Sequence, residues 1–151
     1  MEKELKKTPL FNYYKEKNVK LMDFGGWALP VQFSGIADEH KSVRTYAGLF
    51  DVSHMGEILV KGKDAGVFLN YLLTNDVSKI KIGQAQYNAI VNEHGGTIDD
   101  LIIFKLDEEG YLVTPNASNS DTVLHWMEDH RTGDAAWENS SDDIGWLALQ
   151  G

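Results

Sequence analysis

A glycine pair between two strand-like runs is the feature that most limits how this chain can fold. Gly95-Gly96 lies in the segment Asn92–Asp100, which joins the apolar run Gln86–Val91 to the apolar run Leu101–Leu106. Glycine readily adopts the positive φ that a tight turn needs, so the two runs are predicted to form a hairpin. The hairpin delivers two adjacent carboxylates, Asp99-Asp100, to the start of its second strand.

The two carboxylates are expected to serve different faces of the sheet, because successive side chains of a strand point in opposite directions. The face set of Asp100 contains Asp100, Ile102 and Phe104, and that of Asp99 contains Asp99, Leu101 and Ile103. Only one aspartate can therefore enter a given pocket. The alternative is that both are ordinary turn residues, since aspartate readily bonds nearby backbone.

The composition is that of a one-domain globular protein. With 151 residues, 42% of them hydrophobic and 25% charged, the chain is expected to fold around a single core. It has no cysteine, which excludes thiolate metal sites, thiol nucleophiles and disulfides. The net charge of -9 argues against a nucleic-acid or anionic-membrane partner.

The hydropathy of the chain predicts neither a membrane span nor a targeting signal. No apolar run is long enough to cross a bilayer, and Met1–Lys7 mixes both charge signs without an apolar core. A cytoplasmic location is expected.

The order of helical and strand-like patterns predicts an α+β or mixed α/β sheet with helices on one face. Helices are expected at 10–17, 36–47, 65–73 and 121–130. The first is predicted to be capped by Thr8, with Pro9 in its first turn, the third by Asp64 and the fourth by Ser118 or Ser120. The second is expected to be a cover helix that ends at Gly48. Strands are expected at 20–24, 49–60 with a bend near 53–56, 83–91, 101–106, 111–114, 133–140 and 144–149; Gly25 to Pro30 is expected to be a loop, and Pro115 to end its strand.

The histidines do not form a metal motif. His40, His54, His94, His125 and His130 lack the spacing of a zinc site, and no metal is expected. Ser53-His54 is not a catalytic pair either, because neighbours on a strand point apart, and His54 is interpreted as a structural hydrogen-bonding residue.

The surroundings expected for Asp100 favour a binding site. Ile102 and Phe104 share its face, and Tyr87 is available from the partner strand. A carboxylate above an aromatic and aliphatic floor suits a flat heterocycle with N–H groups, as in a pterin-like or purine-like pocket.

Four motifs, in the same order, resemble one known family. They are Thr8-Pro9-Leu10 with Asp23-Phe24-Gly25-Gly26-Trp27, then Asp51-Val52-Ser53-His54-Met55-Gly56-Glu57, the Gly83-x-Ala85-x-Tyr87 pattern, and Gly95-Gly96-Thr97-Ile98-Asp99-Asp100-Leu101. From residue 8 to residue 151 the chain closely resembles the N-terminal part of the aminomethyltransferase (T-protein) of the glycine cleavage system. This chain departs from the family at two positions. It has Phe104 where relatives often have Tyr, and Pro115 interrupts a strand that is usually an uninterrupted apolar run in the family.

The resemblance implies that residues 1–151 are the N-terminal folate-binding portion of a longer chain whose C-terminal domains are absent, with a mixed, mostly antiparallel sheet and helices packed on it. It implies an enzyme that transfers a one-carbon unit from the aminomethyl-lipoyl arm of H-protein to tetrahydrofolate and releases ammonia. The fragment alone is expected to be inactive. By the same resemblance Asp100 is the catalytic, folate-contacting residue, and the folate pocket is lined by Met55, Tyr87, Asp100, Ile102, Phe104 and Asn116.

Two other functions stay open from the sequence. One is a non-catalytic folate-binding module or scaffold protein, like the folate-binding relatives that maintain iron-sulfur proteins. The other is the folate domain of a demethylating flavoenzyme, which calls for a flavin domain upstream, whereas only seven residues precede Thr8.

Overall fold

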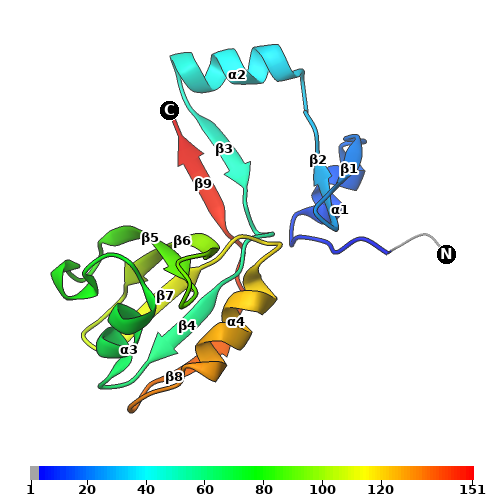
Figure 1. Ribbon diagram of the computed structural model, residues 1–151. Helices are drawn as coiled ribbons and strands as arrows, with labels where there is room; N and C mark the ends of the chain where they lie inside the picture. Colours follow the sequence, from blue (N-terminus) through cyan, green and yellow to red (C-terminus); the bar gives the residue numbers. More distant parts are fainter. Residues whose placement is uncertain (1–3) are drawn as a thin grey trace. The chain divides into compact units, whose positions relative to one another are not determined.

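The computed structural model describes residues 4–151, which divide into two compact units. The first unit comprises the described residues up to His54 together with Ile144–Gly151, and the second unit is Met55–Asp143 (Figure 1). The chain thus forms two compact units, although most of the buried hydrophobic side chains of residues 4–151 gather in one core cluster, as expected. The large cluster of buried hydrophobic side chains lies within the second unit.

The first unit is built from two short helices and two separate two-stranded ribbons. Its elements are α1 (Phe11–Glu16), β1 (Leu21–Phe24), β2 (Trp27–Pro30), α2 (Ile36–Thr45), β3 (Gly48–Asp51) and β9 (Leu147–Gln150). The antiparallel pairs are β1 with β2 and β3 with β9. Each ribbon is thus a small structure without a wide sheet behind it.

Several expectations for the first unit need correction. The expected loop at Gly25 to Pro30 is a hairpin, in which Gly25 and Gly26 take the positive φ of the turn and Trp27–Pro30 forms β2. Helix α2 forms as expected, but none of its residues is buried, so it does not act as a cover helix. Gly48 begins β3 instead of terminating the helix in a left-handed conformation.

The second unit is a five-stranded antiparallel sheet with two helices and a short 3₁₀ turn. Its elements are β4 (Ile58–Lys61), α3 (Ala65–Leu72), η1 (Val77–Lys79), β5 (Ala85–Val91), β6 (Thr97–Lys105), β7 (Gly110–Thr114), α4 (Ser120–Asp129) and β8 (Ala136–Asn139). The strand order is β5-β6-β7-β4-β8, and every recorded strand pair is antiparallel. The predicted fold class, a mostly antiparallel α+β sheet with packed helices, is confirmed.

The core lies on one face of this sheet. Helices α3 and α4 bury Phe68, Leu69, Val123 and Met127 in the same cluster as alternate sheet residues such as Ile103. Burial of these apolar side chains is the main stabilising contribution to the unit. We call this side the helix face and the opposite side the open face.

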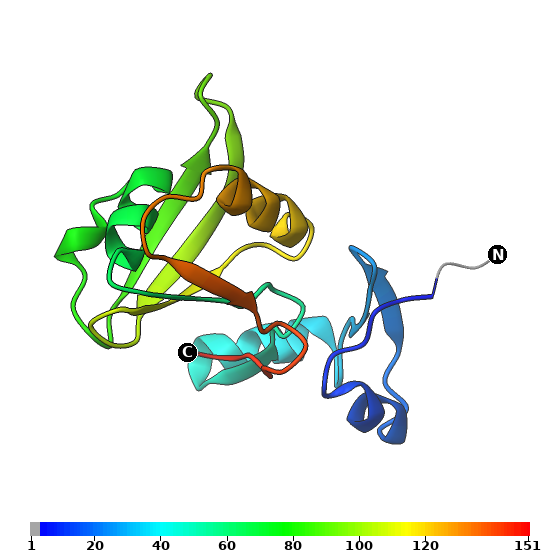
Figure 2. The ribbon, with the colours of Figure 1, turned by 90° about the horizontal axis from the view of Figure 1, so that it is seen from below.

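The predicted hairpin is present and is longer than expected. Gly95 takes the positive φ of the turn, and the Asn92 side chain accepts hydrogen bonds from the backbone N–H groups of His94 and Gly96. Figure 2 shows this turn projecting beyond the rest of the sheet. Because β6 already begins at Thr97, both aspartates are strand residues, and the alternative that they belong to the turn is wrong.

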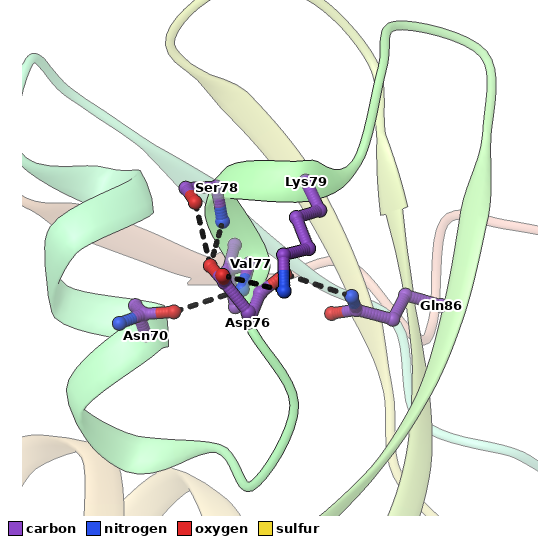
Figure 3. Close-up of polar contacts among 6 residues, drawn as sticks. All are labelled: Asn70, Asp76, Val77, Ser78, Lys79 and Gln86. Atoms are coloured by element: carbon purple, nitrogen blue, oxygen red, sulfur yellow. Dashed lines mark hydrogen bonds and ion pairs between the residues drawn. The ribbon is translucent and has the colours of Figure 1, made fainter.

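A hydrogen-bonded turn after α3 fixes the start of β5 (Figure 3). Asp76 accepts from the backbone N–H of Ser78 at 3.0 Å and pairs with Lys79 at 3.2 Å, while the Gln86 side chain donates to the Asp76 carbonyl at 2.9 Å. Nearby, the Asn75 amide donates to the carbonyl oxygen of Tyr87 at 2.6 Å. These contacts hold the backbone of the strand that carries Tyr87.

Candidate functional site

Tyr87 and Asp100 meet on the open face of the sheet. The register pairs Tyr87 with Ile102 and Ala89 with Asp100, so Tyr87 and Asp100 are diagonal neighbours on adjacent strands. The Tyr87 hydroxyl donates a hydrogen bond of 2.8 Å to Oδ2 of Asp100. The pKa of Tyr87 is raised, because this hydrogen bond and the nearby carboxylate charge disfavour the phenolate.

Asn116 contacts Asp100 from the other side. It follows the end of β7, where Pro115 ends the strand as expected. Its side-chain amide donates to the carbonyl oxygen of Asp100 at 2.9 Å and to Oδ1 of Asp100 at 3.3 Å. Tyr87 and Asn116 therefore hold the Asp100 carboxylate between them.

Ile102 and Phe104 provide the expected floor, but the site is not enclosed. The alternation along β6 puts Asp100, Ile102 and Phe104 on the open face, as the sequence predicts. Asp100 is exposed, Ile102 is 38% exposed and Tyr87 is 61% exposed. These residues form an open platform with one fixed carboxylate.

Met55 stands apart from this group. It is half-buried in the segment that precedes β4, and β7 separates β4 from β6 in the sheet. No recorded hydrogen bond or ring contact among residues 4–151 links Met55 to the platform. Of the predicted site residues, the platform brings together Tyr87, Asp100, Ile102, Phe104 and Asn116.

Asp99 points to the helix face and is 3% exposed. Its Oδ2 accepts a 2.8 Å bond from the Asn116 backbone N–H, and its Oδ1 accepts bonds from the side-chain amides of Asn116 at 2.8 Å and Asn119 at 2.7 Å. A buried carboxylate needs such donors, because it has lost its water shell. The sequence could not identify these partners, which lie 17 and 20 residues further along the chain.

Glu57 is a buried acid that no pattern in the sequence singles out. Its side chain is fully buried directly before β4, and no described residue from 4 to 151 donates a hydrogen bond to either carboxylate oxygen. Burial raises the pKa of Glu57 to about 7, since the ionised form has lost its solvation. The only sequence signal was its place at the end of the Asp51–Glu57 motif.

His54 does not behave as the expected hydrogen-bonding residue. Its ring packs edge-to-face against Phe24, and its buried Nδ1 has no hydrogen-bond partner among residues 4–151. Burial lowers the pKa of His54, and the neighbouring Asp51 charge acts in the opposite direction. The hydroxyl of Ser53 donates to the carbonyl oxygen of Trp146 at 3.2 Å and accepts from the Trp146 backbone N–H at 2.9 Å.

The first unit contains an apolar cavity of about 690 Å³ lined by aromatic residues including Tyr13, Tyr14, Phe33 and Phe50. At its edge, Asp51 accepts hydrogen bonds from the hydroxyls of Thr8 at 2.7 Å and Tyr14 at 2.6 Å. Burial works to raise the pKa of Asp51, but these bonds and those from Ser53 outweigh it and hold the pKa low. None of the predicted site residues lines this cavity.

The described residues offer no ready place for a metal. Within residues 4–151, no three side chains of histidine, aspartate or glutamate converge in a metal-binding arrangement. In the same range, no helix combines the length and apolarity that crossing a bilayer requires.

A comparison with protein-family models identifies the family of the chain that carries this platform. The model described as the GCVT N-terminal domain matches residues 10–151, which is nearly the whole chain. This chain belongs to the GCVT N-terminal domain family. The match includes every residue of the platform, both ribbons of the first unit and all of the second unit.

Two curated relatives of this chain carry the name aminomethyltransferase. The chain is 56% identical over 148 residues to an aminomethyltransferase of Listeria monocytogenes serotype 4b, covering 98% of this chain and 41% of the relative. It is 56% identical over 147 residues to the aminomethyltransferase of Bacillus subtilis strain 168, covering 97% and 41%. This GCVT N-terminal domain thus spans about two fifths of the length of the curated relatives it matches.

A solved structure has the same fold. The crystal structure of glycine cleavage system aminomethyltransferase T from Bartonella henselae superposes with a TM-score of 0.89 at 36% sequence identity. The match covers 97% of this chain and 41% of that one. The GCVT N-terminal domain of this chain therefore keeps the fold of an aminomethyltransferase over nearly its full length.

Proposed function

We propose that this chain is the folate-binding portion of a cytoplasmic aminomethyltransferase of the glycine cleavage system. The complete enzyme transfers the one-carbon unit of an aminomethyl-lipoyl group, carried by H-protein, to tetrahydrofolate. The observation that carries the proposal is the Asp100 carboxylate, held by Tyr87 and Asn116 beside the exposed Ile102 on one sheet face. The names of the relatives give independent support.

The platform suits the recognition of a reduced pterin. An ionised carboxylate accepts hydrogen bonds from N–H groups, and the flat ring system rests on the side chains of Ile102 and Phe104. Tyr87 and Asn116 fix the carboxylate in one orientation before the substrate arrives, so little reorganisation is needed during the reaction. No metal and no covalent enzyme intermediate is part of the proposal.

The reaction balances without an oxidant or reductant. The carbon of R–S–CH₂–NH₃⁺ loses its bonds to sulfur and to nitrogen and gains bonds to two folate nitrogens, giving 5,10-methylenetetrahydrofolate. The two folate N–H protons leave with the thiol and with ammonium. Asp100 contributes by stabilising the positive charge that develops on the folate amine and on the transferred carbon.

The test is the Asp100→Asn substitution in the complete gene product. We expect turnover, measured as tetrahydrofolate-dependent ammonia release from aminomethylated carrier protein, to fall by at least about 100-fold, because a preorganised electrostatic contact is lost. Tetrahydrofolate affinity should fall by less than about tenfold, since the apolar floor is intact. The matched control is Asp107→Asn, the same change at an exposed position in the turn after β6.

Three results contradict parts of this proposal. Equal turnover in Asp100→Asn and Asp107→Asn shows that Asp100 is not the catalytic carboxylate. Tetrahydrofolate binding by the parent protein without any transfer points to a non-catalytic folate-binding module. Transfer that proceeds without tetrahydrofolate removes folate from the proposal.

A further inference from the structure

The amide of Asn116 is shared between the two aspartates of β6. Its nitrogen donates to Oδ1 of Asp99 on the helix face and to the carbonyl oxygen and Oδ1 of Asp100 on the open face. The same side chain thus contacts a buried carboxylate and an exposed one. It is the direct physical link between the two faces at this point of the sheet.

The Asp99 carboxylate determines which way this amide points. Both of its oxygens are occupied as acceptors, one by the Asn116 backbone N–H and the other by the side-chain amides of Asn116 and Asn119. A carboxylate has no proton to donate when ionised, so the Asn116 side chain must present its NH₂ group to it. The carbonyl oxygen of that amide is then directed away from Asp99 and Asp100 and can accept a hydrogen bond.

We propose that Asp99 is a positioning residue, which acts through Asn116 to hold Asp100 in the orientation needed for the transfer reaction. The inference rests on the proposed function and deepens it. Asp99 is buried and lies on the helix face, opposite the face on which the platform would hold the substrate. Substituting a group that orients a substrate-contacting residue in this way typically lowers activity by about 10- to 100-fold.

Asp99 also fixes the chain segment that carries Asn116. The Asn119 backbone N–H donates to the carbonyl oxygen of Asn116 at 2.9 Å, and the Asn119 carbonyl accepts from Val123 in the first turn of α4. With both asparagines bonded to Asp99, the segment between β7 and α4 is tied to β6. Asn116 therefore has a fixed backbone as well as a fixed amide.

The decisive variant is Asp99→Asn, because it preserves size but not hydrogen-bonding pattern. Whichever way the new amide turns, its NH₂ group faces at least one N–H donor that Asp99 accepted before. In the complete protein we expect turnover to fall about 10- to 100-fold while tetrahydrofolate affinity changes by less than about threefold. Asn116→Ala should also lower turnover, and the double variant should be no worse than the more damaged single variant, since both changes break one pathway.

The control for general destabilisation is Ile103→Val. It removes one buried methylene from the face of β6 that also carries Asp99, and it leaves the hydrogen bonds of Asn116 in place. It should keep both turnover and tetrahydrofolate affinity within about threefold of the parent. If Asp99→Asn fails to fold, Asn119→Ala is the milder test, because it removes one of the three bonds to Asp99. A drop in its turnover of about three- to tenfold supports the inference, and unchanged turnover overturns it.

The outcomes separate this inference from the proposed function. Full turnover in Asp99→Asn, or turnover losses that multiply in the double variant with Asn116→Ala, overturn the positioning role alone. A similar loss in Ile103→Val also overturns it, because any weakening of the strand then has the same effect. A parent protein that transfers no aminomethyl carbon overturns the proposed function instead.

Discussion

The two faces of the five-stranded sheet carry the same kinds of side chain for different purposes. On the helix face, Asp99 and Ile103 are buried, and every polar contact of Asp99 is to a neutral amide of the protein. On the open face, Asp100 is exposed and Ile102 is partly exposed, next to a tyrosine hydroxyl and the same asparagine. The difference shows that residue type alone does not assign a role: burial ties one aspartate to amides of the protein and leaves its neighbour available to a ligand.

The largest expected effect contrasts the two isoleucines. Ile103→Ala should lower the unfolding free energy by about 2 to 5 kcal/mol, because it opens a cavity at a fully buried position. Ile102→Ala should cost less than about 1 kcal/mol, since water already reaches that side chain, but it should weaken tetrahydrofolate binding. Urea denaturation followed by circular dichroism measures both; similar losses for the two variants mean that the open face is covered in solution.

The next largest effect is on the pH dependence of stability and comes from Glu57. The Glu57 carboxyl is buried like that of Asp99, but no hydrogen-bond donor among residues 4–151 contacts it. With a folded-state pKa of about 7 against an ordinary value near 4.3, the folded protein binds the proton more tightly than the unfolded chain. The neutral carboxyl group therefore contributes to the unfolding free energy fully below pH 4. This contribution, up to about 3 kcal/mol, is lost as the pH rises to about 7. Glu57→Gln should remove this part of the pH dependence and be more stable than the parent at pH 8.

Thermal or urea unfolding between pH 4 and pH 9 tests the Glu57 prediction. Glu108→Gln, at an exposed position in the turn between β6 and β7, removes the same charge and is the control. Equal pH dependence of stability in the parent and in Glu57→Gln means that the carboxyl finds a partner or water when the protein is in solution.

The smallest effect is on the ionisation of Tyr87. Its pKa is raised by the hydrogen bond to Asp100, so Asp100→Asn should shift the pKa of Tyr87 back toward its ordinary value near 10. The measurement is an NMR titration of ¹³C-labelled tyrosine, with the Tyr87 signal assigned by its absence in Tyr87→Phe. No shift on substitution means that the Tyr87 hydroxyl and Asp100 do not form a lasting bond in solution.

The local sequence predicted element types and helix starts better than it predicted the hydrogen bonds that cap the helices. The hairpin, the alternation along β6 and the strand end at Pro115 follow from backbone preferences and side-chain period, which act within a few residues. The predicted caps Thr8, Asp64 and Ser118 or Ser120 make no capping bond at α1, α3 or α4. The Thr8 hydroxyl instead donates to the Asp51 carboxylate, and the Asp64 carboxylate accepts from the backbone N–H of Asp134. These two side chains therefore bond to residues distant in sequence and not to the first turn of the helix.

The same division explains what was found and missed at the site. That Asp100, Ile102 and Phe104 share a face could be read from β6 alone, and Tyr87 followed from the hairpin. The Asp99 partners could not, because Asn116 and Asn119 arrive through β7 and the start of α4. The burial of Glu57 likewise depends on how its surroundings fold.

By itself, the sequence determined that two neighbouring carboxylates must lie on opposite sides of a strand, because a strand repeats every two residues. Only the tertiary structure decided which side is covered, since that depends on where α3 and α4 pack, and it alone supplied the amides that satisfy Asp99. Hydrogen-bond partners distant in sequence become neighbours only when the whole unit folds.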